Sequence, residues 1–322
     1  MNTELVDKQL RVSLESFPEL DIWTDLGKTR ARAREMRAKI IGQLPVIEGI
    51  ESSDYLIPQP DAPDVLVRVY RPKNQIDSLP AMLWIHGGGY CFGSMENDDN
   101  TARQIAKSVG VIVVSVDYRL APEHPFPKPL VDCFSALKWL VESADMLAVD
   151  PARIAIGGIS AGGGLAAGLS LFVRDKTSIK PKFQFLLCPM IDDRSSTPSS
   201  YMITDKRIWN RNSNLIGWQY YLGKENTSAD EHYEDISPYA APSRAISLSG
   251  LPATYIGVGS VDAFVDENRD YATRLEADKV DIQLEIFDGG FHGFEFIAPG
   301  ADISRIAREY HYSALRKGLF DQ

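Results

Sequence analysis

Residues 157–164 read Gly-Gly-Ile-Ser-Ala-Gly-Gly-Gly, and the segment from Gly158 to Gly162 matches the pattern G-x-S-x-G. An apolar run at 153–156 precedes this stretch, and apolar residues continue after it at helical spacing from Leu165. A strand that enters and a helix that leaves would place Ser160 on a sharp turn with its hydroxyl exposed. Glycines on both sides suit such a turn, because a Cβ there would clash with the crowded backbone. The alternative is a glycine-rich turn in which Ser160 merely caps the helix.

The composition of the 322-residue chain is that of a globular protein with a sizeable core. Apolar residues make up 44% of the chain and charged residues 24%, which are ordinary proportions for a folded protein. The net charge of −10 at pH 7 argues against nucleic acids and anionic membranes as partners. The length suits one large α/β domain or two small ones.

The cysteines and the N-terminus bear on the cellular compartment. Cys91, Cys133 and Cys188 form no C-x-x-C pair and show no spacing typical of metal ligands. A sparse, odd set of cysteines favours a reducing compartment without a disulfide framework. Residues 1–7 lack the basic segment and apolar core of a signal peptide, and no apolar run reaches the roughly 18 residues of a membrane span. We therefore expect a cytoplasmic protein that does not bind membranes.

Strand and helix signals alternate along most of the chain. The runs at 81–85 and 111–116 are continuously apolar, as strands buried on both faces are. Two alternating strands at 50–57 and 65–70 come first, joined by a hairpin-like connection. Alternating βα units predict an α/β fold with a mostly parallel, doubly wound sheet and helices on both faces, and the opening hairpin adds antiparallel strands at one edge. Further strands are expected at 154–156, 183–187, 253–258 and 282–287, and helices at 4–20, 24–42, 100–108, 131–143, 268–277 and 303–319.

The regular spacing fails after Pro189. About sixty residues separate it from the next strand signal, far more than one crossover connection needs. They contain an apolar helical pattern that includes Trp209 and Trp218, which indicates an inserted helical subdomain. The expected division is therefore N-terminal helices at 1–48, the first part of the α/β domain at 49–189, the insertion at 190–251 and the second part of the α/β domain at 252–322.

Reactive groups follow several of the predicted strands, where ligands bind in an open α/β sheet. The sequence His-Gly-Gly-Gly stands at 86–89, directly after the first buried strand. Successive glycines let backbone N–H groups approach a ligand oxygen with no side chain in the way. We expect the N–H groups of Gly88 and Gly89, together with that of Ala161 after the serine, to form an oxyanion hole. The alternative for the glycines is a simple β-turn.

An acid and a base stand after the last two predicted strands. Asp262 follows one of them at a place where an acid can orient an imidazole, and His292 lies in a glycine-rich loop after the other. The order of serine, aspartate and histidine along the chain is the one described for catalytic triads on this kind of sheet. Asp266 and Glu267 suit the first turn of the following helix, where carboxylates favour the helix dipole, so we interpret them as structural.

These segments together resemble the hormone-sensitive lipase family of α/β-hydrolases, the bacterial family IV carboxylesterases. The resemblance covers nearly the whole chain from about residue 50 to residue 294. It is carried by the segments His-Gly-Gly-Gly at 86–89, Asp-Tyr-Arg-Leu-Ala-Pro-Glu-His-Pro-Phe-Pro at 117–127, Ser-Ala-Gly-Gly at 160–163 and His-Gly-Phe at 292–294, with Asp262. It implies the α/β-hydrolase fold and a carboxylesterase for short- to medium-chain esters, with Ser160 as nucleophile, His292 as base and Asp262 as the acid that orients it.

The resemblance also implies how the parts are arranged. The N-terminal helices and the insertion are expected to form a cap over the site, and two copies are expected to pair through an edge strand near 253–258. The reaction requires a small-molecule ester as substrate and no metal or cofactor. A short cap and an acidic chain favour small, water-soluble esters over lipid droplets.

The sequence departs from the family pattern close to the serine. Ile159 stands before the nucleophile, where the family usually has Asp or Thr, and Gly164 stands where Asn is common. Asp262 is followed by Ala-Phe in place of the usual Pro or Val and then Leu. No catalytic group is lost, but the acyl preference is affected by the first change. The candidate pocket residues are Ile159, Tyr90, Trp209 and Trp218; the alternative role for the tryptophans is the core of the cap itself.

Two features near the site are interpreted as scaffold. His86 is expected to anchor the glycine loop and not to act as an acid or base. The proline-dense segment 117–127 predicts one or two cis peptide bonds, at Ala121-Pro122 or Phe126-Pro127.

Two other classes of function remain open. An amidase or deacetylase would use the same triad, because the acyl-enzyme chemistry is shared and only the leaving group differs. A ligand-binding relative without catalytic activity is the other alternative, although the serine and the histidine that catalysis needs are both present.

Overall fold

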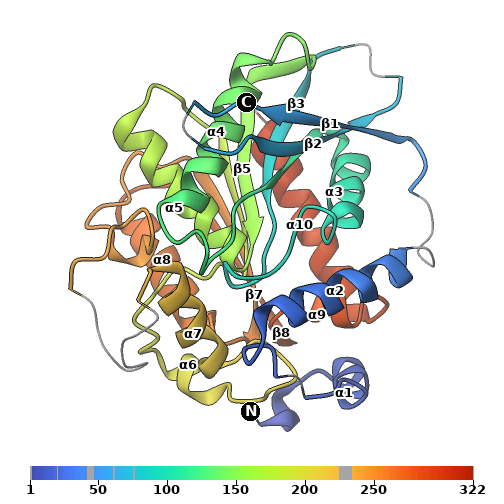
Figure 1. Cartoon of the computed structure of the whole chain (residues 1–322), viewed down its shortest axis with the longest axis vertical. Helices are drawn as coiled ribbons and strands as arrows, with labels where there is room; N and C mark the ends of the chain where they lie inside the picture. The colour runs from blue at the N-terminus through green and yellow to red at the C-terminus, as the bar shows by residue number, and fades with distance from the viewer. Residues whose placement is uncertain are drawn as a thin grey trace.

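The computed structural model describes residues 2–19, 21–41, 47–60, 62–74, 77–224 and 234–321. The expected division into N-terminal helices and an insertion therefore extends in part beyond the described residues, at 42–46 and at 225–233. Every helix and strand named below lies wholly within the described ranges (Figure 1).

An eight-stranded sheet with the order β1-β2-β4-β3-β5-β6-β7-β8 forms the centre of the molecule. The pairs β1–β2 and β2–β4 are antiparallel and all other neighbouring pairs are parallel. The predicted mostly parallel sheet with antiparallel strands at one edge is therefore confirmed. The strands are β1 (Ile50–Ile57), β2 (Val65–Pro72), β3 (Leu79–Ile85), β4 (Ile112–Asp117), β5 (Val149–Ile159), β6 (Phe183–Leu187), β7 (Ala253–Val261) and β8 (Ile282–Phe291).

Helices cover both faces of this sheet, because the central strands are apolar on both sides. All five residues of β6, for example, are buried. The two faces carry separate hydrophobic clusters, one formed with α4, α5 and α8 and the other formed largely with α3 and α10. These helices are α3 (Asp99–Ile105), α4 (Lys128–Glu142), α5 (Ala161–Lys176), α8 (Val265–Ala277) and α10 (Asp302–Phe320), with a short π-helical turn η2 (Ala106–Gly110) after α3.

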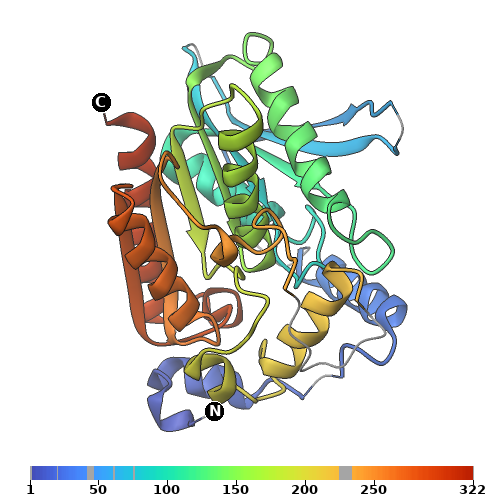
Figure 2. The same cartoon turned by 90° about the vertical axis from the view of Figure 1, so that its left-hand side faces the viewer.

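The remaining helices gather at one end of the molecule. Figures 1 and 2 show α1, α2, α6 and α7 beside the end of the sheet toward which the parallel strands point. Segments from the N-terminus and from the predicted insertion therefore lie together near the carboxyl ends of the strands. Their bounds are η1 (Thr3–Leu5), α1 (Lys8–Glu15), α2 (Leu26–Ile41), α6 (Pro198–Met202), α7 (Arg211–Tyr221) and η3 (Pro242–Arg244), and a short α9 (Phe294–Ile297) precedes α10.

Two expectations are corrected by the structure. The strand at 253–258 is not an edge strand, because β7 lies between β6 and β8 and the two edges are β1 and β8. The helix expected over 4–20 is shorter and starts later, since the carboxylate of Asp7 accepts the N–H groups of Gln9 and Leu10 and so caps a new helix. An N-cap of this kind fixes where α1 begins.

Two further observations concern the backbone and the helices. The peptide bonds Ala121-Pro122 and Phe126-Pro127 are both cis, as predicted for this segment. None of the helices in the described ranges combines the length and the apolar character that crossing a membrane demands.

Candidate active site

Ser160 occupies the turn between β5 and α5, in a backbone conformation that residues with side chains rarely adopt. Its φ is 56° and its ψ is −123°. A Cβ added at Gly158 would collide with the carbonyl of Gly162, and one added at Gly162 would collide with the carbonyl of Ile85. The Ser160 N–H donates to the carbonyl of Leu187 at 2.8 Å. The glycines therefore permit the turn, and the neighbouring strand holds it.

The serine, the histidine and the aspartate predicted from the sequence meet at this turn. The distance from His292 Nε2 to Ser160 Oγ is 3.0 Å, and that from His292 Nδ1 to Asp262 Oδ2 is 2.8 Å. The other carboxylate oxygen of Asp262 accepts the N–H of Phe264 at 3.0 Å. Three residues from the ends of three strands therefore form one continuous chain of hydrogen bonds.

The surroundings of His292 tune its basicity and fix its ring. Burial by itself would lower the pKa of His292, but the charge of the nearby Asp262 carboxylate and its hydrogen bond to the ring oppose this effect, and the pKa is raised well above its usual 6.5. The ring of Phe264 meets the imidazole edge to face, with the centroids 5.0 Å apart. A carboxylate that stabilises the protonated imidazole is the arrangement that a general base requires.

The predicted oxyanion loop lies beside the serine. Gly88 and Gly89 have φ values of 120° and 57°, which favour glycine over any other residue. A Cβ added at Gly87 would lie 3.3 Å from the Cβ of Ser160, which shows how closely the loop approaches the turn. Among the described residues, no acceptor is found for the N–H groups of Gly88, Gly89 or Ala161. These three donors are thus free to bind an oxygen atom.

His86 anchors this loop, as interpreted from the sequence. Its ring stacks on Tyr118 with the centroids 4.2 Å apart, and the Tyr118 hydroxyl donates to the His86 carbonyl at 2.9 Å. The side chain is 1% exposed, and burial lowers its pKa. A buried histidine held in this way positions the glycine loop and stays neutral.

Three of the four candidate pocket residues are aromatic, and they differ in exposure. Trp209 is partly exposed and lies against the oxyanion loop, because a Cβ added at Gly89 would collide with its indole ring. Tyr90 and Trp218 are 0% and 2% exposed and pack against Tyr221. Both are large rings that fill the core where the predicted cap meets the sheet, and a role for Tyr90 and Trp218 in lining the pocket stays a prediction.

Three further aromatic residues extend the wall begun by Trp209. The ring of Trp23, from the N-terminal segment, lies 5.9 Å from that of Trp209 and 5.1 Å from that of Phe92. Tyr220 joins them from α7 at 5.8 Å from Trp23. The position of Phe92 three residues after the glycine loop is the only signal in the sequence that points to it.

Ile159, next to Ser160, faces a small internal cavity. This cavity of about 10 Å³ is also lined by Cys188 and Asp262, and it has room for about one water molecule. A larger cavity of about 490 Å³, between α3, α9 and α10, shares Leu187 and Glu295 with the small one. The two cavities therefore share part of their walls, from the side of Asp262 to α10.

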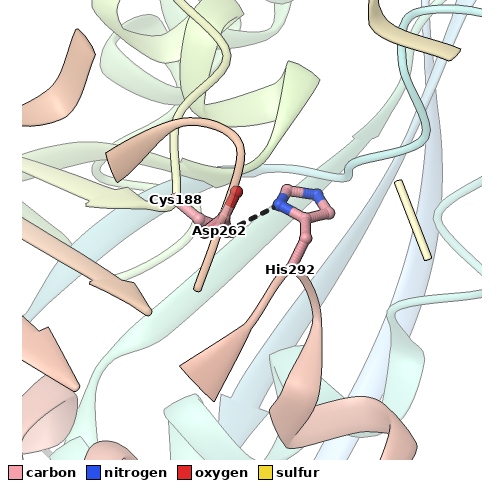
Figure 3. Close-up of side chains that lie close together, drawn as sticks. All are labelled: Cys188, Asp262 and His292. Atoms are coloured by element: carbon pink, nitrogen blue, oxygen red, sulfur yellow. Dashed lines mark hydrogen bonds and ion pairs between the residues drawn. The ribbon is translucent and has the colours of Figure 1, made fainter. Parts of the chain in front are cut away.

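Cys188 is a residue near the triad that was not singled out by the sequence analysis. It directly follows β6, with a φ of 36° and 7% exposure. Its thiol lies within 4.8 Å of ligand atoms of both Asp262 and His292, and Figure 3 shows the three side chains together. Its place at the carboxyl end of a predicted strand, where ligands bind in such a sheet, was the available signal.

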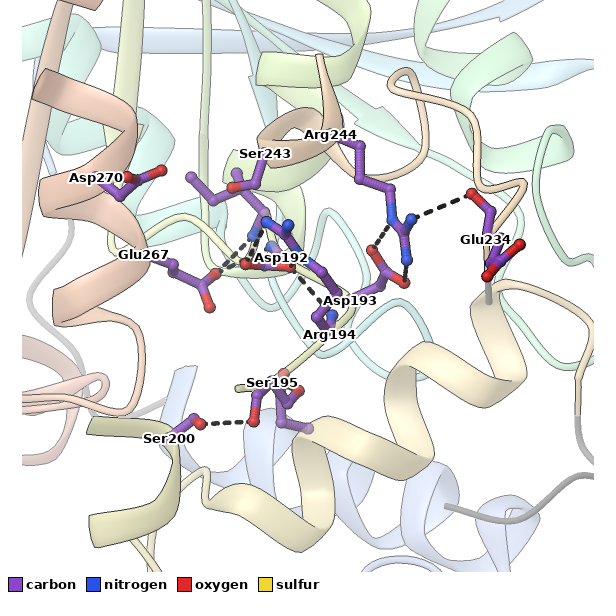
Figure 4. Close-up of polar contacts among 12 residues, drawn as sticks. Asp192, Asp193, Arg194, Ser195, Ser200, Glu234, Ser243, Arg244, Glu267 and Asp270 are labelled. Carbon is purple, nitrogen blue, oxygen red and sulfur yellow. Dashed lines mark hydrogen bonds and ion pairs between the residues drawn. The ribbon is translucent and has the colours of Figure 1, made fainter. Parts of the chain in front are cut away.

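A network of polar contacts joins the connection after β6 to α8 (Figure 4). One oxygen of Glu267 accepts the N–H groups of Ile191 and Asp192 at 2.8 and 3.3 Å, and Asp266 accepts the N–H of Ser199 at 2.8 Å. The Arg244 guanidinium donates two hydrogen bonds, of 2.6 and 2.8 Å, to the carboxylate of Asp193. Asp266 and Glu267 thus hold the segment that leads into α6, in agreement with their structural interpretation.

Comparison with known proteins gives a consistent picture. A family described as having the alpha/beta hydrolase fold matches residues 82–296. The carboxylesterase NlhH of Mycobacterium tuberculosis is 34% identical over 304 residues, which cover 92% of each chain. The arylesterase of Saccharolobus solfataricus is 31% identical over 274 residues, covering 82% of this chain and 83% of the relative. A solved structure of a bacterial heroin esterase is 38% identical and superposes with a TM-score of 0.93 over 99% of both chains.

Proposed function

This chain belongs to the alpha/beta hydrolase family and is a carboxylic ester hydrolase, and we propose that it cleaves short- to medium-chain esters through Ser160, His292 and Asp262. We further propose that it is a member of the hormone-sensitive lipase branch. The observation that carries the catalytic assignment is the unbroken chain from Ser160 Oγ through the imidazole to the Asp262 carboxylate, with steps of 3.0 and 2.8 Å.

The first half of the reaction forms an acyl-enzyme. Ser160 Oγ attacks the ester carbonyl while His292 Nε2 takes its proton, and Asp262 keeps the imidazole in the required tautomer and stabilises the imidazolium. The negative oxygen of the tetrahedral intermediate accepts hydrogen bonds from the N–H groups of Gly88, Gly89 and Ala161. The imidazolium then gives its proton to the leaving alcohol.

The second half releases the acid. Water replaces the alcohol, and its oxygen attacks the acyl carbonyl while His292 removes a proton from it. The imidazolium then gives this proton to Ser160 Oγ as the bond from Oγ to the acyl carbon breaks, which releases the acid and frees the serine. The same three N–H groups stabilise the second tetrahedral intermediate. The groups that move protons, Ser160 and His292, and the carboxylate of Asp262 lie within hydrogen-bond reach of one another at the turn.

The substrate class follows from the surroundings of the triad. We propose that α1, α2, α6 and α7 act as a cap, and the aromatic wall of Trp23, Phe92, Trp209 and Tyr220 supports a small apolar group as part of the substrate. The net charge of −10 supports a freely dissolved ester and not an anionic lipid surface.

A series of chromogenic p-nitrophenyl esters of increasing acyl length tests this proposal. We expect the highest kcat/KM for short and medium acyl chains, no jump in rate at an oil–water interface, and loss of hydrolysis in Ser160→Ala. Matched acetanilides separate the classes, because an esterase turns over the acetyl ester far faster than the anilide. A rate that increases with acyl length beyond about ten carbons, with activation at an interface, would contradict the proposed substrate class; equal rates on the anilide would indicate an amidase.

A further inference from the structure

Cys188 adds a soft ligand beside the proposed base and its carboxylate. Its thiol, an oxygen of Asp262 and a ring nitrogen of His292 all lie within 4.8 Å of one another. The three residues directly follow β6, β7 and β8, which are neighbours in the sheet. The backbone of three adjacent strands therefore directs three different ligand types toward one point (Figure 3).

We propose that these three side chains form an inhibitory binding site for a soft divalent cation of the Zn²⁺ class. Thiolate, imidazole and carboxylate are the ligands that Zn²⁺ takes in proteins, and three protein ligands leave a fourth position for water. In a tetrahedral zinc site, bonds of about 2.0–2.3 Å place the ligand atoms roughly 3.4–3.6 Å apart, so shifts of about 1 Å suffice here. The cavity of about 10 Å³ that Cys188 and Asp262 line gives room for such a shift.

Binding of the cation would stop the proton transfer, whichever ring nitrogen it occupies. At Nε2 it takes the lone pair that otherwise accepts the Ser160 proton. At Nδ1 it moves the remaining imidazole proton to Nε2, which again leaves no lone pair for the serine. In both cases Cys188 binds as a thiolate and its proton passes to solvent, so the uptake of each ion releases one proton from the thiol.

Cys188 gives this site its selectivity for soft cations. A serine hydrolase triad without a neighbouring thiol offers such an ion only the imidazole and the carboxylate. The other two cysteines are in separate parts of the core: Cys133 lies on α4 and Cys91 follows the glycine loop, and both are 0% exposed. Cys133→Ala is therefore a matched control for the loss of a buried thiol elsewhere.

Inhibition by Zn²⁺ and direct binding of Co²⁺ test the proposal separately. Ester hydrolysis is measured against free Zn²⁺ in the wild type, Cys188→Ser, Cys188→Ala and Cys133→Ala, with each rate taken relative to that of the same protein in chelator. We expect reversible inhibition of the wild type and of Cys133→Ala, and a half-inhibitory concentration at least about 10-fold higher in both Cys188 variants. The two Cys188 variants guard against one of them failing to fold.

Co²⁺ absorption provides a readout that does not depend on activity. A thiolate-to-Co²⁺ charge-transfer band is expected in the wild type and in Ser160→Ala, and it should vanish in Cys188→Ser. The inhibitory effect rests on the proposed role of His292 as base, whereas the binding does not. A charge-transfer band from a protein that shows no ester hydrolysis even in chelator would therefore overturn the proposed function and leave the cation site standing. Equal Zn²⁺ sensitivity in the wild type and the Cys188 variants, or no band in the wild type, would overturn the cation site.

Discussion

Ser160 holds a strained conformation because its hydroxyl must stand clear of β5 and α5. A non-glycine residue with a φ of 56° carries a backbone cost of about 1–3 kcal/mol, which the surrounding structure has to offset. The Ser160 N–H donates to the Leu187 carbonyl at 2.8 Å, and the Ser160 carbonyl accepts the N–H of Met190 at 3.0 Å. These two hydrogen bonds connect the turn to β6 and to the segment that follows it. Strain at this residue is therefore part of how the nucleophile is presented.

The pKa of His292 determines the acid limb of the pH profile. Because the nearby carboxylate of Asp262 raises this pKa well above 6.5, the imidazole becomes protonated at a higher pH than a free histidine does. A protonated imidazole cannot accept the Ser160 proton, so kcat/KM should start to fall, as the pH is lowered, above the value near 6.5 that an unperturbed histidine gives. A profile that stays flat down to about pH 5 would remove His292 from the role of base.

Replacing the orienting carboxylate should both slow the enzyme and shift this limb. Asp262→Asn is expected to lower kcat by about 10⁴-fold, because the amide favours the wrong tautomer, and to move the acid limb to lower pH. Asp266→Asn serves as the control, since that carboxylate accepts the N–H of Ser199 and lies 3.5 Å from Arg269 Nη1 but does not contact His292, and its kcat should stay close to that of the wild type. A larger loss in Asp266→Asn than in Asp262→Asn would assign the acid to the wrong residue.

At the scale of elements, Glu267 of α8 holds the connection that leaves β6. Burial, reinforced by Asp192, raises the pKa of Glu267 well above 4.5, so the folded protein keeps this proton to a higher pH than the unfolded chain does. Between the two pKa values the folded state binds more protons, and stability falls as the pH rises. Glu267→Gln is neutral throughout and keeps the acceptor oxygen. As the pH rises above the ordinary glutamate value of 4.5, its melting temperature should gain on that of the wild type. A difference in melting temperature that does not change with pH would show that the pKa of Glu267 is not raised in the folded protein.

The oxyanion loop and the cap side of the molecule are coupled through Gly89 and Trp209. In Gly89→Ala the added methyl group would collide with the Trp209 indole, and alanine is strained at a φ of 57°. The N–H groups of the oxyanion loop should therefore lose their alignment, and kcat should fall by about 10²–10³-fold. Trp209→Ala removes the collision. In the double variant part of the lost kcat should return, which is measured as a double-mutant cycle. Additive effects would mean that the loop and Trp209 act independently.

Local patterns identified most elements but not all of their limits. The buried strands, the elbow and the glycine loop follow from runs of apolar residues and glycines, which carry their own structural signal. The start of α1 depends on a single cap formed by Asp7, and the pattern of apolar residues extends across it. β5 and β8 extend beyond their apolar cores to Val149 and Phe291, because pairing with neighbouring strands continues where apolarity does not.

At the scale of the whole molecule, the site combines residues from most of the chain. Trp23 is contributed by the N-terminal segment, Trp209 by the predicted insertion and His292 by the last loop after the sheet. The meeting of Ser160, His292 and Asp262 was predictable from their strand-end positions. The strand order was not, since β7 was expected at an edge and lies inside the sheet; nothing in a single strand's sequence records its neighbours. For the same reason the strand-end position of Cys188 pointed to the ligand-binding edge of the sheet, but not to its place beside Asp262 and His292.

Trp209 and Trp218 are expected to have different roles, the first in contact with substrate and the second in the packing of the core. Trp209 is partly exposed beside the oxyanion loop, whereas Trp218 is 2% exposed and packs on Tyr90. We expect Trp209→Ala to change the relative kcat/KM among esters with little loss of stability. Trp218→Ala should lower the free energy of unfolding by about 3–5 kcal/mol, because a large buried ring is lost. Ester-panel kinetics and thermal melts on both variants give the comparison, and the opposite pattern would exchange their roles.

Covalent trapping of the nucleophile tests the catalytic assignment most directly. The protein is treated with a p-nitrophenyl phosphate triester, which phosphorylates an activated serine, and the modified residue is located by mass spectrometry of the digested chain. The account predicts one adduct per chain, on Ser160, with loss of ester hydrolysis in proportion to labelling and no adduct in Ser160→Ala. An adduct on another residue, or full hydrolysis in Ser160→Ala, would contradict it.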